Sequence, residues 1–217
     1  LIKLGIFTQE AIDQEIQDFD NLLDERLDLS KSTEILNIQH FLIEEYKAFK
    51  QPKGTDLFKK IDTAVPAEKL RSLALQLFDM PKDWKFFKKA LKIVEDRVQM
   101  VNDNRLDWAV CELLAYGSLV LDGYPVRLSG QDSQRGTFAH RHAVFVEEET
   151  GRKYYPLNDL NPNQPHFHVF NSPLSEYGVL GFEYGYSLAT PNKLTIWEAQ
   201  FGDFVNVAQV IIDQYIC

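Results

Sequence analysis

The chain has 217 residues, of which 45% are hydrophobic and 25% are charged, and its formal net charge is -9. This composition is typical of a globular protein, and because no apolar run is long enough to cross a bilayer, we expect no membrane partner. We also expect no nucleic-acid partner, because affinity for a phosphate backbone comes from clustered Lys and Arg side chains and no basic stripe is visible.

The first half of the sequence predicts four amphipathic helices. Apolar residues recur at steps of three and four across residues 12–23, 35–49, 70–77 and 84–98, with Thr8 as the N-cap of the first helix. Such stripes usually face a core, and the lysines of the fourth segment face solvent or, as a second interpretation, form a docking surface. We interpret residues 1–102 as a helical linker region with a scaffolding role.

From residue 103 onward the pattern changes to alternating helices and strands. Asp107 is the N-cap of a fifth helix, Ser172 and Pro173 predict the cap and first residue of another, and residues 205–216 form a last amphipathic run. Short apolar segments predict strands at 124–128, 143–146, 153–157, 167–170 and 193–197. Alternation of this kind predicts an α/β domain with a mainly parallel, layered sheet over residues 103–217.

We expect function to lie in residues 125–142, PVRLSGQDSQRGTFAHRH. Gly130 and Gly136 bracket a polar loop after a buried strand, and ligands in open α/β sheets bind beyond the carboxyl ends of the strands. An ordinary surface turn has the same pattern. Two later runs, SPLSEYGVLGFEYGY at 172–186 and TIWEAQFGDF at 195–204, strengthen the functional interpretation.

The runs RLSGQDSQRGTF, RHAV, LSE, GFEYGY, WEAQFGDF and IIDQY stand in one order across residues 126–216. With them the chain closely resembles the 2-oxoglutarate dehydrogenase family, specifically its thiamine-diphosphate-dependent decarboxylating component. The helices before residue 101 resemble the family's linker between two cofactor-binding domains, through looser motifs.

This resemblance implies a transketolase-like pyrimidine-binding domain over residues 103–217 and thiamine diphosphate as the cofactor. It implies 2-oxoglutarate as the substrate, and as the partner a lipoyl-bearing succinyltransferase component that receives the succinyl unit. It further implies a homodimer of the full-length enzyme, in the bacterial cytoplasm or the mitochondrial matrix.

The resemblance assigns the catalytic role to Glu176, in the motif LSE. Enzymes of the thiamine diphosphate superfamily use a glutamate at this helix start to hydrogen-bond the aminopyrimidine ring. A carboxyl group suits the position because it can exchange a proton with the ring nitrogen, which drives the shift between amino and imino tautomers, whereas an amide cannot titrate. From the residues alone, Glu176 is also explained as an acid placed favourably at a helix start.

Four further residues match positions of the family that contact the cofactor. Phe204 would line the pyrimidine pocket with Phe201 nearby, and flat aromatic rings suit this role because a pyrimidine can stack on them. Leu174 would support the ring, and the Gln131 amide would donate or accept a hydrogen bond. Ordinary core packing would also explain each phenylalanine.

The helix that contains Glu176 has two further features. Gly178, Gly181 and Gly185 fall within a narrow stripe, and because each glycine weakens a helix, we expect close packing of another backbone there. Glu183 lies seven residues beyond Glu176 on the same face, and we interpret it as the partner of a polar group without a catalytic role.

The histidines form two pairs, His140 with His142 and His166 with His168. In a strand this spacing places each pair on one face, and a four-histidine metal site is one interpretation. Neither pair has the spacing of a zinc motif, so we predict no metal and expect substrate contact or burial instead.

The motif that carries the cofactor's diphosphate in this superfamily, GlyAspGly followed by an asparagine, does not occur in the sequence. We therefore expect that site, with its magnesium ion, in a part of the parent protein before Leu1. The chain reads as an excised fragment, since Leu1 is not an initiator methionine and Cys217 ends an amphipathic run. Its two cysteines are too few for a disulfide framework and fit a reducing compartment.

Two alternatives stay open at this point. The first is the 2-oxoadipate dehydrogenase relative of the same family. The second is a non-catalytic α/β interaction module, in which Glu176 is a helix-end charge and Phe204 belongs to a core.

Overall fold

A computed structural model describes residues 2–32, 42–202 and 204–217, and the chain divides into two compact units, Leu1–Phe41 and Leu42–Cys217. The first unit holds the 3-10 turn η1 (Ile2–Leu4) and helix α1 (Gln9–Ser32). Thr8 caps α1 as predicted, because its Oγ1 accepts a hydrogen bond of 3.2 Å from the Ala11 amide. No residue of α1 is buried, so the expected core-facing role of its apolar stripe is not seen within this unit.

The second unit contains the remaining elements. The helix predicted at 35–49 lies partly outside the described residues, and within the described positions 42–49 the helix α2 spans only Ile43–Tyr46. The further helices and turns of the second unit are η2 (Gly54–Phe58), α3 (Ala67–Leu77), α4 (Lys88–Asn102), α5 (Trp108–Leu121), η3 (Pro156–Asn158), α6 (Glu176–Leu188), η4 (Gln200–Gly202), α7 (Val205–Ile211) and the π-helical turn η5 (Ile212–Ile216). Its strands are β1 (Val126–Gly130), β2 (Phe145–Val146), β3 (Lys153–Tyr154), β4 (Phe167–Asn171) and β5 (Leu194–Glu198).

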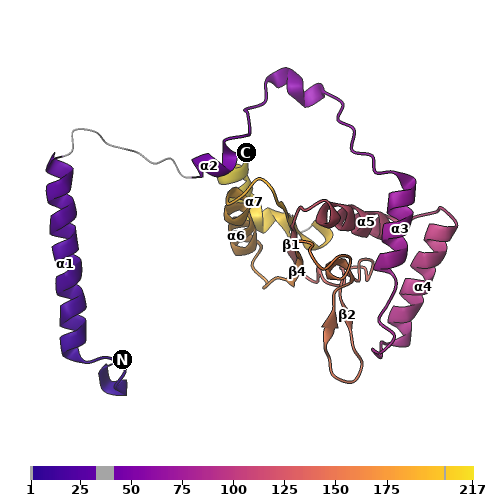
Figure 1. The fold of residues 1–217 in the computed structure, drawn as a ribbon, viewed down its shortest axis with the longest axis horizontal. Helices are drawn as coiled ribbons and strands as arrows, with labels where there is room; N and C mark the ends of the chain where they lie inside the picture. The colour runs from indigo at the N-terminus through magenta and orange to yellow at the C-terminus, as the bar shows by residue number, and fades with distance from the viewer. Residues whose placement is uncertain (1, 33–41, 203) are drawn as a thin grey trace. The chain divides into compact units, whose positions relative to one another are not determined.

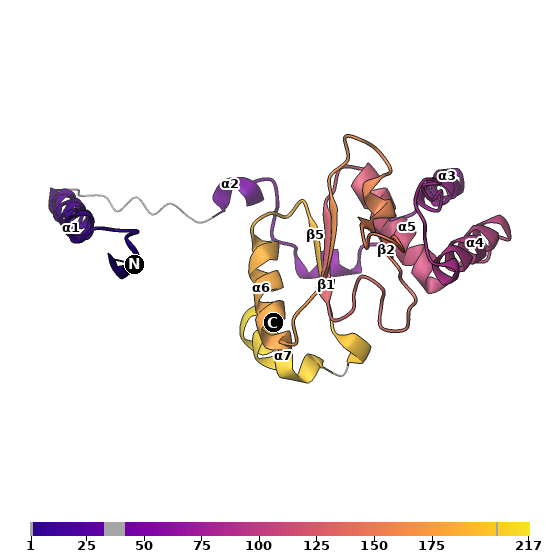
Figure 2. The same cartoon turned by 90° about the horizontal axis from the view of Figure 1, so that it is seen from below.

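The main sheet has three strands in the order β4-β1-β5, and both pairings are parallel, as the alternating pattern predicts. Helices cover both faces: α6 and α7 lie on one side of the strands, and α5 with α3 and α4 lies on the other (Figures 1 and 2). Strands β2 and β3 form a separate antiparallel hairpin. The α/β class and the layered sheet are thus confirmed.

The register of the sheet decides which side chains meet which helix layer. Leu128 stands opposite Val169 and Ile196, and this row belongs to the main hydrophobic core with α3, α4 and α5. The neighbouring row places Arg127 opposite His168 and Thr195, and because side chains alternate along a strand, this row faces the α6 layer. One face of β1 is therefore apolar and the other is polar.

Helix α6 begins later than predicted. Its first residue is Glu176 and Ser175 holds the N-cap position, whereas the sequence predicts Ser172 as the cap and Pro173 as the first residue. The Ser172 amide instead donates a hydrogen bond of 2.8 Å to the Gly130 carbonyl, and the Ser175 amide donates to the Pro173 carbonyl. These bonds hold residues 172–175 in a turn at the edge of the sheet. The helix therefore begins only at Glu176.

The glycine stripe of α6 does not meet another backbone among the described residues. A Cβ at Gly181 would touch only the Ile211 side chain of α7, and one at Gly185 would meet open space. The expected backbone packing is therefore not present here. In the described part of the chain, no helix is long and apolar enough to cross a membrane.

Candidate functional site

Gln131 and Glu176 meet at the carboxyl edge of the sheet. Gln131 follows the last residue of β1, and Glu176 opens the helix that follows the neighbouring parallel strand β4. The Gln131 Nε2 donates a hydrogen bond to Glu176 Oε1. Glu176 is only partly buried, so its carboxyl group can reach a ligand as well as Gln131. Two residues 45 positions apart thus form one polar pair.

A second contact fixes the orientation of α6 against β1. Arg127 donates from Nε and Nη2 to the two oxygens of Glu183, at 2.7 and 2.8 Å. Gln131 at the end of β1 meets the start of α6, and Arg127 near the beginning of β1 meets Glu183 further along, so the helix runs antiparallel to the strand. Glu183 thus has a polar partner, as the sequence predicts, and the structure identifies it as Arg127.

The Arg127 guanidinium lies within an aromatic environment. It is 4.6 Å from the ring centres of both Phe170 and Tyr186 and 5.4 Å from that of Phe182. The hydrogen bonds to Glu183 raise the pKa of Arg127, although burial opposes this. Arg127 therefore remains charged at physiological pH, and both oxygens of Glu183 are occupied by this contact.

The three apolar residues assigned to the site are all exposed. Leu174 is 84% exposed, Phe201 58% and Phe204 40%. Phe201 lies in η4 with a φ of 58° and packs edge-on against Phe138, at a centroid distance of 5.2 Å. These side chains present apolar surface outward instead of filling a core.

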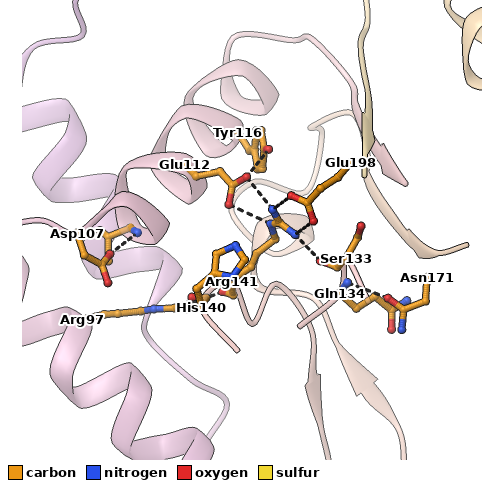
Figure 3. A network of polar contacts seen from close by, with 11 residues as sticks. Arg97, Asp107, Glu112, Tyr116, Ser133, Gln134, His140, Arg141, Asn171 and Glu198 are labelled. Carbon is orange, nitrogen blue, oxygen red and sulfur yellow. Dashed lines mark hydrogen bonds and ion pairs between the residues drawn. The ribbon is translucent and has the colours of Figure 1, made fainter. Parts of the chain in front are cut away.

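A buried arginine, Arg141, lies at the centre of a network of polar contacts (Figure 3). This network holds the loop of residues 131–142, which carries Gln131 and Phe138. Arg141, only 1% exposed, donates to Glu112 of α5 at 2.9 and 3.0 Å. It also donates to both oxygens of Glu198 at the end of β5, one of them at 3.1 Å, and to the Ser133 carbonyl at 2.9 Å. Burial lowers the pKa of Arg141, but the hydrogen bonds to Glu198 and Glu112 outweigh this and raise it. The arginine is therefore permanently charged.

Two neighbours extend this network. The Tyr116 hydroxyl donates to Glu112 Oε1 at 2.8 Å, and burial and the Glu112 carboxylate raise the pKa of Tyr116, so it stays a donor. From α4, Arg97 Nη2 donates to the carbonyls of His140 and Arg141, at 2.7 and 2.6 Å. Elements from α4 to β5 thus converge on one loop.

The donors and acceptors at this edge fit a flat heteroaromatic ring. The Glu176 carboxylate and the Gln131 amide meet at this edge, and the segment after the adjacent strand β5 carries the exposed rings of Phe201 and Phe204. These groups suit a ring that both stacks and hydrogen-bonds through a nitrogen. At Gly130 a Cβ would collide with the Glu198 carbonyl oxygen, so only glycine permits the two strand ends to approach this closely. The buried hydroxyls of Ser129 and Ser133 beside it have no hydrogen-bond partner within the described part of the chain. These two hydroxyl groups can therefore form further hydrogen bonds.

The histidine pairs do not converge on a metal site. Among residues 2–32, 42–202 and 204–217, no three His, Cys, Asp or Glu side chains lie together in a group that could hold a metal ion. His166 and His168 contact each other, with ring centres 5.6 Å apart, and His168 stacks on Phe170. Burial, followed by the charges of Arg97 and Arg135, lowers the pKa of His142.

No motif of the sequence indicates the Arg141 network. Its signal was present as charged residues at apolar positions: Glu112 within an apolar helix and Glu198 at the end of a strand. A buried charge needs a partner, but the sequence does not show which residues 29 and 57 positions away supply it.

The second half of the chain matches a known domain family, and the whole chain is similar to known proteins. Residues 104–217, just over half of the chain, match the family described as "Transketolase, pyrimidine binding domain". The chain is 44% identical over 218 residues to the "2-oxoglutarate dehydrogenase E1 component" of Coxiella burnetii. It is 42% identical over 219 residues to "2-oxoglutarate dehydrogenase-like, mitochondrial" of Xenopus laevis and to "2-oxoglutarate dehydrogenase, mitochondrial" of Saccharomyces cerevisiae.

These similarities cover the whole chain but a small part of each relative. All 217 residues align, whereas the alignment spans 23% of the Coxiella protein and 22% of the Xenopus and yeast proteins. The chain thus spans less than a quarter of the length of these relatives.

Proposed function

Because the chain belongs to the transketolase pyrimidine-binding family, we propose that residues 103–217 supply the pyrimidine half of a thiamine diphosphate site. The parent enzyme is a 2-oxoglutarate dehydrogenase that decarboxylates 2-oxoglutarate and passes the succinyl unit to a lipoyl group. The observation that carries the proposal is the Gln131–Glu176 hydrogen bond, at the sheet edge where an α/β fold binds ligands.

Each site residue has a defined role in this proposal. Glu176 holds and exchanges a proton at the pyrimidine ring nitrogen, and Gln131 orients the Glu176 carboxyl group through its amide. Phe204 and Phe201 form the apolar wall against which the ring stacks, and Leu174 supports the ring. The cofactor, when bound, supplies the carbon nucleophile and the electron sink for decarboxylation.

The remaining parts of the site belong to other regions of the parent protein. We assign the diphosphate and its magnesium ion to a preceding domain, because the sequence contains no GlyAspGly motif. Residues 1–102 act as the helical linker to that domain. The exposed surfaces of Leu174, Phe201 and Phe204 are consistent with a site that closes only when this second half is present.

The substrate and partners follow from the names of the relatives. Proteins named as 2-oxoglutarate dehydrogenases align along the entire chain at 42–44% identity, which favours 2-oxoglutarate over 2-oxoadipate. The partner is then a lipoyl-bearing succinyltransferase component, and the full-length enzyme is a homodimer of the bacterial cytoplasm or the mitochondrial matrix.

Substitution of Glu176 by glutamine in the full-length enzyme tests the proposal. The variant keeps the shape of the side chain but loses the titrating proton, so turnover should fall by about 100- to 10,000-fold, as expected for a positioned acid or base. Exchange of the thiazolium proton with deuterated solvent, measured by quench flow at saturating cofactor, should slow by a similar factor. The matched control is Glu95→Gln on α4, whose carboxylate is 70% exposed.

Unchanged proton exchange in Glu176→Gln, with an unchanged melting curve, would reduce Glu176 to a helix-end charge. The domain would then be better described as a non-catalytic interaction module. An effect in Glu95→Gln of comparable size would show that the assay reports general instability.

A further inference from the structure

We propose that Arg141 is a positioning residue for the site: it holds the loop of residues 131–142 so that Gln131 stays against Glu176 and Phe138 against Phe201. The inference rests on the proposed function, because Gln131 and Glu176 are the residues assigned there to the cofactor. Arg141 itself is buried and donates to Glu112 of α5, so we assign it no direct contact with the cofactor.

The loop has a backbone that needs outside support. Asp132, Ala139 and His142 have positive φ angles of 55°, 53° and 42°, in a region that residues with a Cβ rarely adopt. Such conformations persist only where the surroundings fix them. Backbone bonds within the loop and two bonds from Gln134 to β4 give part of this support. Two arginine side chains give the rest: Arg141 donates to the Ser133 carbonyl, and Arg97 donates to the carbonyls of His140 and Arg141.

Arg141 also joins the two elements on either side of the loop. Its guanidinium engages both oxygens of Glu112 on α5 and both oxygens of Glu198 at the end of β5 (Figure 3). A planar guanidinium is suited to this double bidentate contact, because its donors lie in a fixed fork. Lysine cannot reproduce it. The loop, α5 and β5 are therefore tied together at a single buried charge.

This arrangement reaches both sides of the site. The Glu198 carbonyl packs against Gly130, the residue directly before Gln131. Phe201, which contacts Phe138, follows Glu198 by three residues. A displacement of Glu198 therefore moves the strand end beside Gln131 and the segment that carries Phe201 together. Arg141 sets the relative position of the polar pair and the aromatic wall.

Amide hydrogen exchange and cofactor titration in the full-length protein test this role. In the cofactor-free protein, Glu198→Gln should speed exchange across residues 131–142 by about tenfold, as expected from weakening a charge-assisted hydrogen bond. Exchange in α3 should not change. The dissociation constant for thiamine diphosphate should rise by about the same factor, and Arg141→Lys should show the same two changes.

The matched control is Glu147→Gln, which alters another buried glutamate. Glu147 accepts hydrogen bonds from Thr150 within the β2–β3 hairpin, so its loss should speed exchange only around that turn and leave cofactor affinity unchanged. Unchanged exchange in residues 131–142 of Glu198→Gln would overturn the proposal. Faster loop exchange with unchanged cofactor affinity would also overturn it, because the network would then be structural only.

Failure of the unsubstituted protein to bind the cofactor would overturn the proposed function itself. That outcome is distinguishable, because the exchange measurement is made without cofactor.

Discussion

The Glu183 carboxylate of α6 and the Arg127 guanidinium of β1 are joined by two hydrogen bonds of 2.7 and 2.8 Å, two helical turns beyond Glu176. The side chain of Glu183 is 3% exposed and that of Arg127 is 16% exposed. Because the pair fixes α6 along its axis, it also determines where Glu176 stands relative to Gln131. The residue that orients the site and the residue assigned to proton exchange thus share one helix face.

Glu183→Gln should lower the free energy of unfolding by about 3 kcal/mol, because the substitution leaves the charge of Arg127 buried without a counter-charge. Urea denaturation at pH 7 measures this. Asp96→Asn is the control: Asp96 pairs with Lys92 at 2.8 Å, but the two side chains are 52% and 66% exposed. Loss of that exposed pair should cost less than about 1 kcal/mol. Equal losses in the two variants would contradict the structural role of Glu183.

Stability should fall as the pH drops below the ordinary histidine value of 6.5, and His142 should account for part of the loss. Burial, Arg97 and Arg135 lower the pKa of His142 in the folded chain, so the unfolded chain binds more protons in the window just below 6.5. The stabilising contribution is complete above that value and decreases below it. Denaturation of His142→Gln at pH 7.5 and 5.5 should show a shallower pH dependence than the unsubstituted chain.

Some pH dependence should remain in His142→Gln, because burial also lowers the pKa of His168. An unaltered slope in His142→Gln would show that the folded chain does not resist protonation of this residue.

Gly185→Ala should stabilise the 217-residue chain. A Cβ at this position meets open space, and alanine is favoured over glycine in a helix interior by about 1 kcal/mol. Thermal unfolding of the variant should therefore shift upward. Gly178→Ala is the comparison, since its Cβ would lie 3.0 Å from the Ser175 hydroxyl and should gain less. A destabilised Gly185→Ala chain would show that another backbone covers the stripe in solution.

Phe204→Ala should weaken cofactor binding by the full-length enzyme by about five- to tenfold, which corresponds to the loss of roughly 1 kcal/mol of aromatic stacking. The melting temperature without cofactor should change little, because the ring is 40% exposed. Calorimetric titration with magnesium present measures the affinity. Phe58→Ala is the control, since that ring is 90% exposed and belongs to η2. Equal affinities in Phe204→Ala and the parent would remove Phe204 from the pyrimidine wall.

The 217-residue chain alone should bind thiamine diphosphate with a dissociation constant above about 10 μM, which corresponds to less than roughly 7 kcal/mol. The reason is that the diphosphate and magnesium contacts are assigned to another part of the parent protein. Calorimetry with cofactor and magnesium measures this. A tighter complex would show that residues 1–217 contain a complete anchor.

Most of the fold could be predicted because its signals are local. Asp107 caps α5 through a hydrogen bond of 2.8 Å to the Val110 amide, as its place before an apolar helix predicts. The start of α6 was mispredicted, because Ser172 and Pro173 form a convincing cap sequence but their segment is needed for a turn against Gly130. A bond to a residue 42 positions earlier has no signal in the local sequence.

In the candidate site, too, the individual residues have local sequence signals and the contacts between them do not. The motifs indicate Gln131 and Glu176 as separate matches, and only the parallel pairing of β1 with β4 brings them into contact. The support for that contact, Arg141 with Glu112 and Glu198, comes from three distant segments. Periodicity identifies which positions are buried, but the pairing of buried charges depends on tertiary geometry.

The exposure of Leu174, Phe201 and Phe204 distinguishes substitutions at these positions from substitutions that destabilise the fold. Substitutions at Val110 or Leu128, both fully buried, lower the population of folded chain and so expose it to proteolytic clearance. Substitutions at the three exposed positions leave that population nearly unchanged. A survey of variants scored by cellular abundance would therefore pass them as harmless. If these residues line the proposed cofactor site, only an assay that reports cofactor occupancy would reveal the defect.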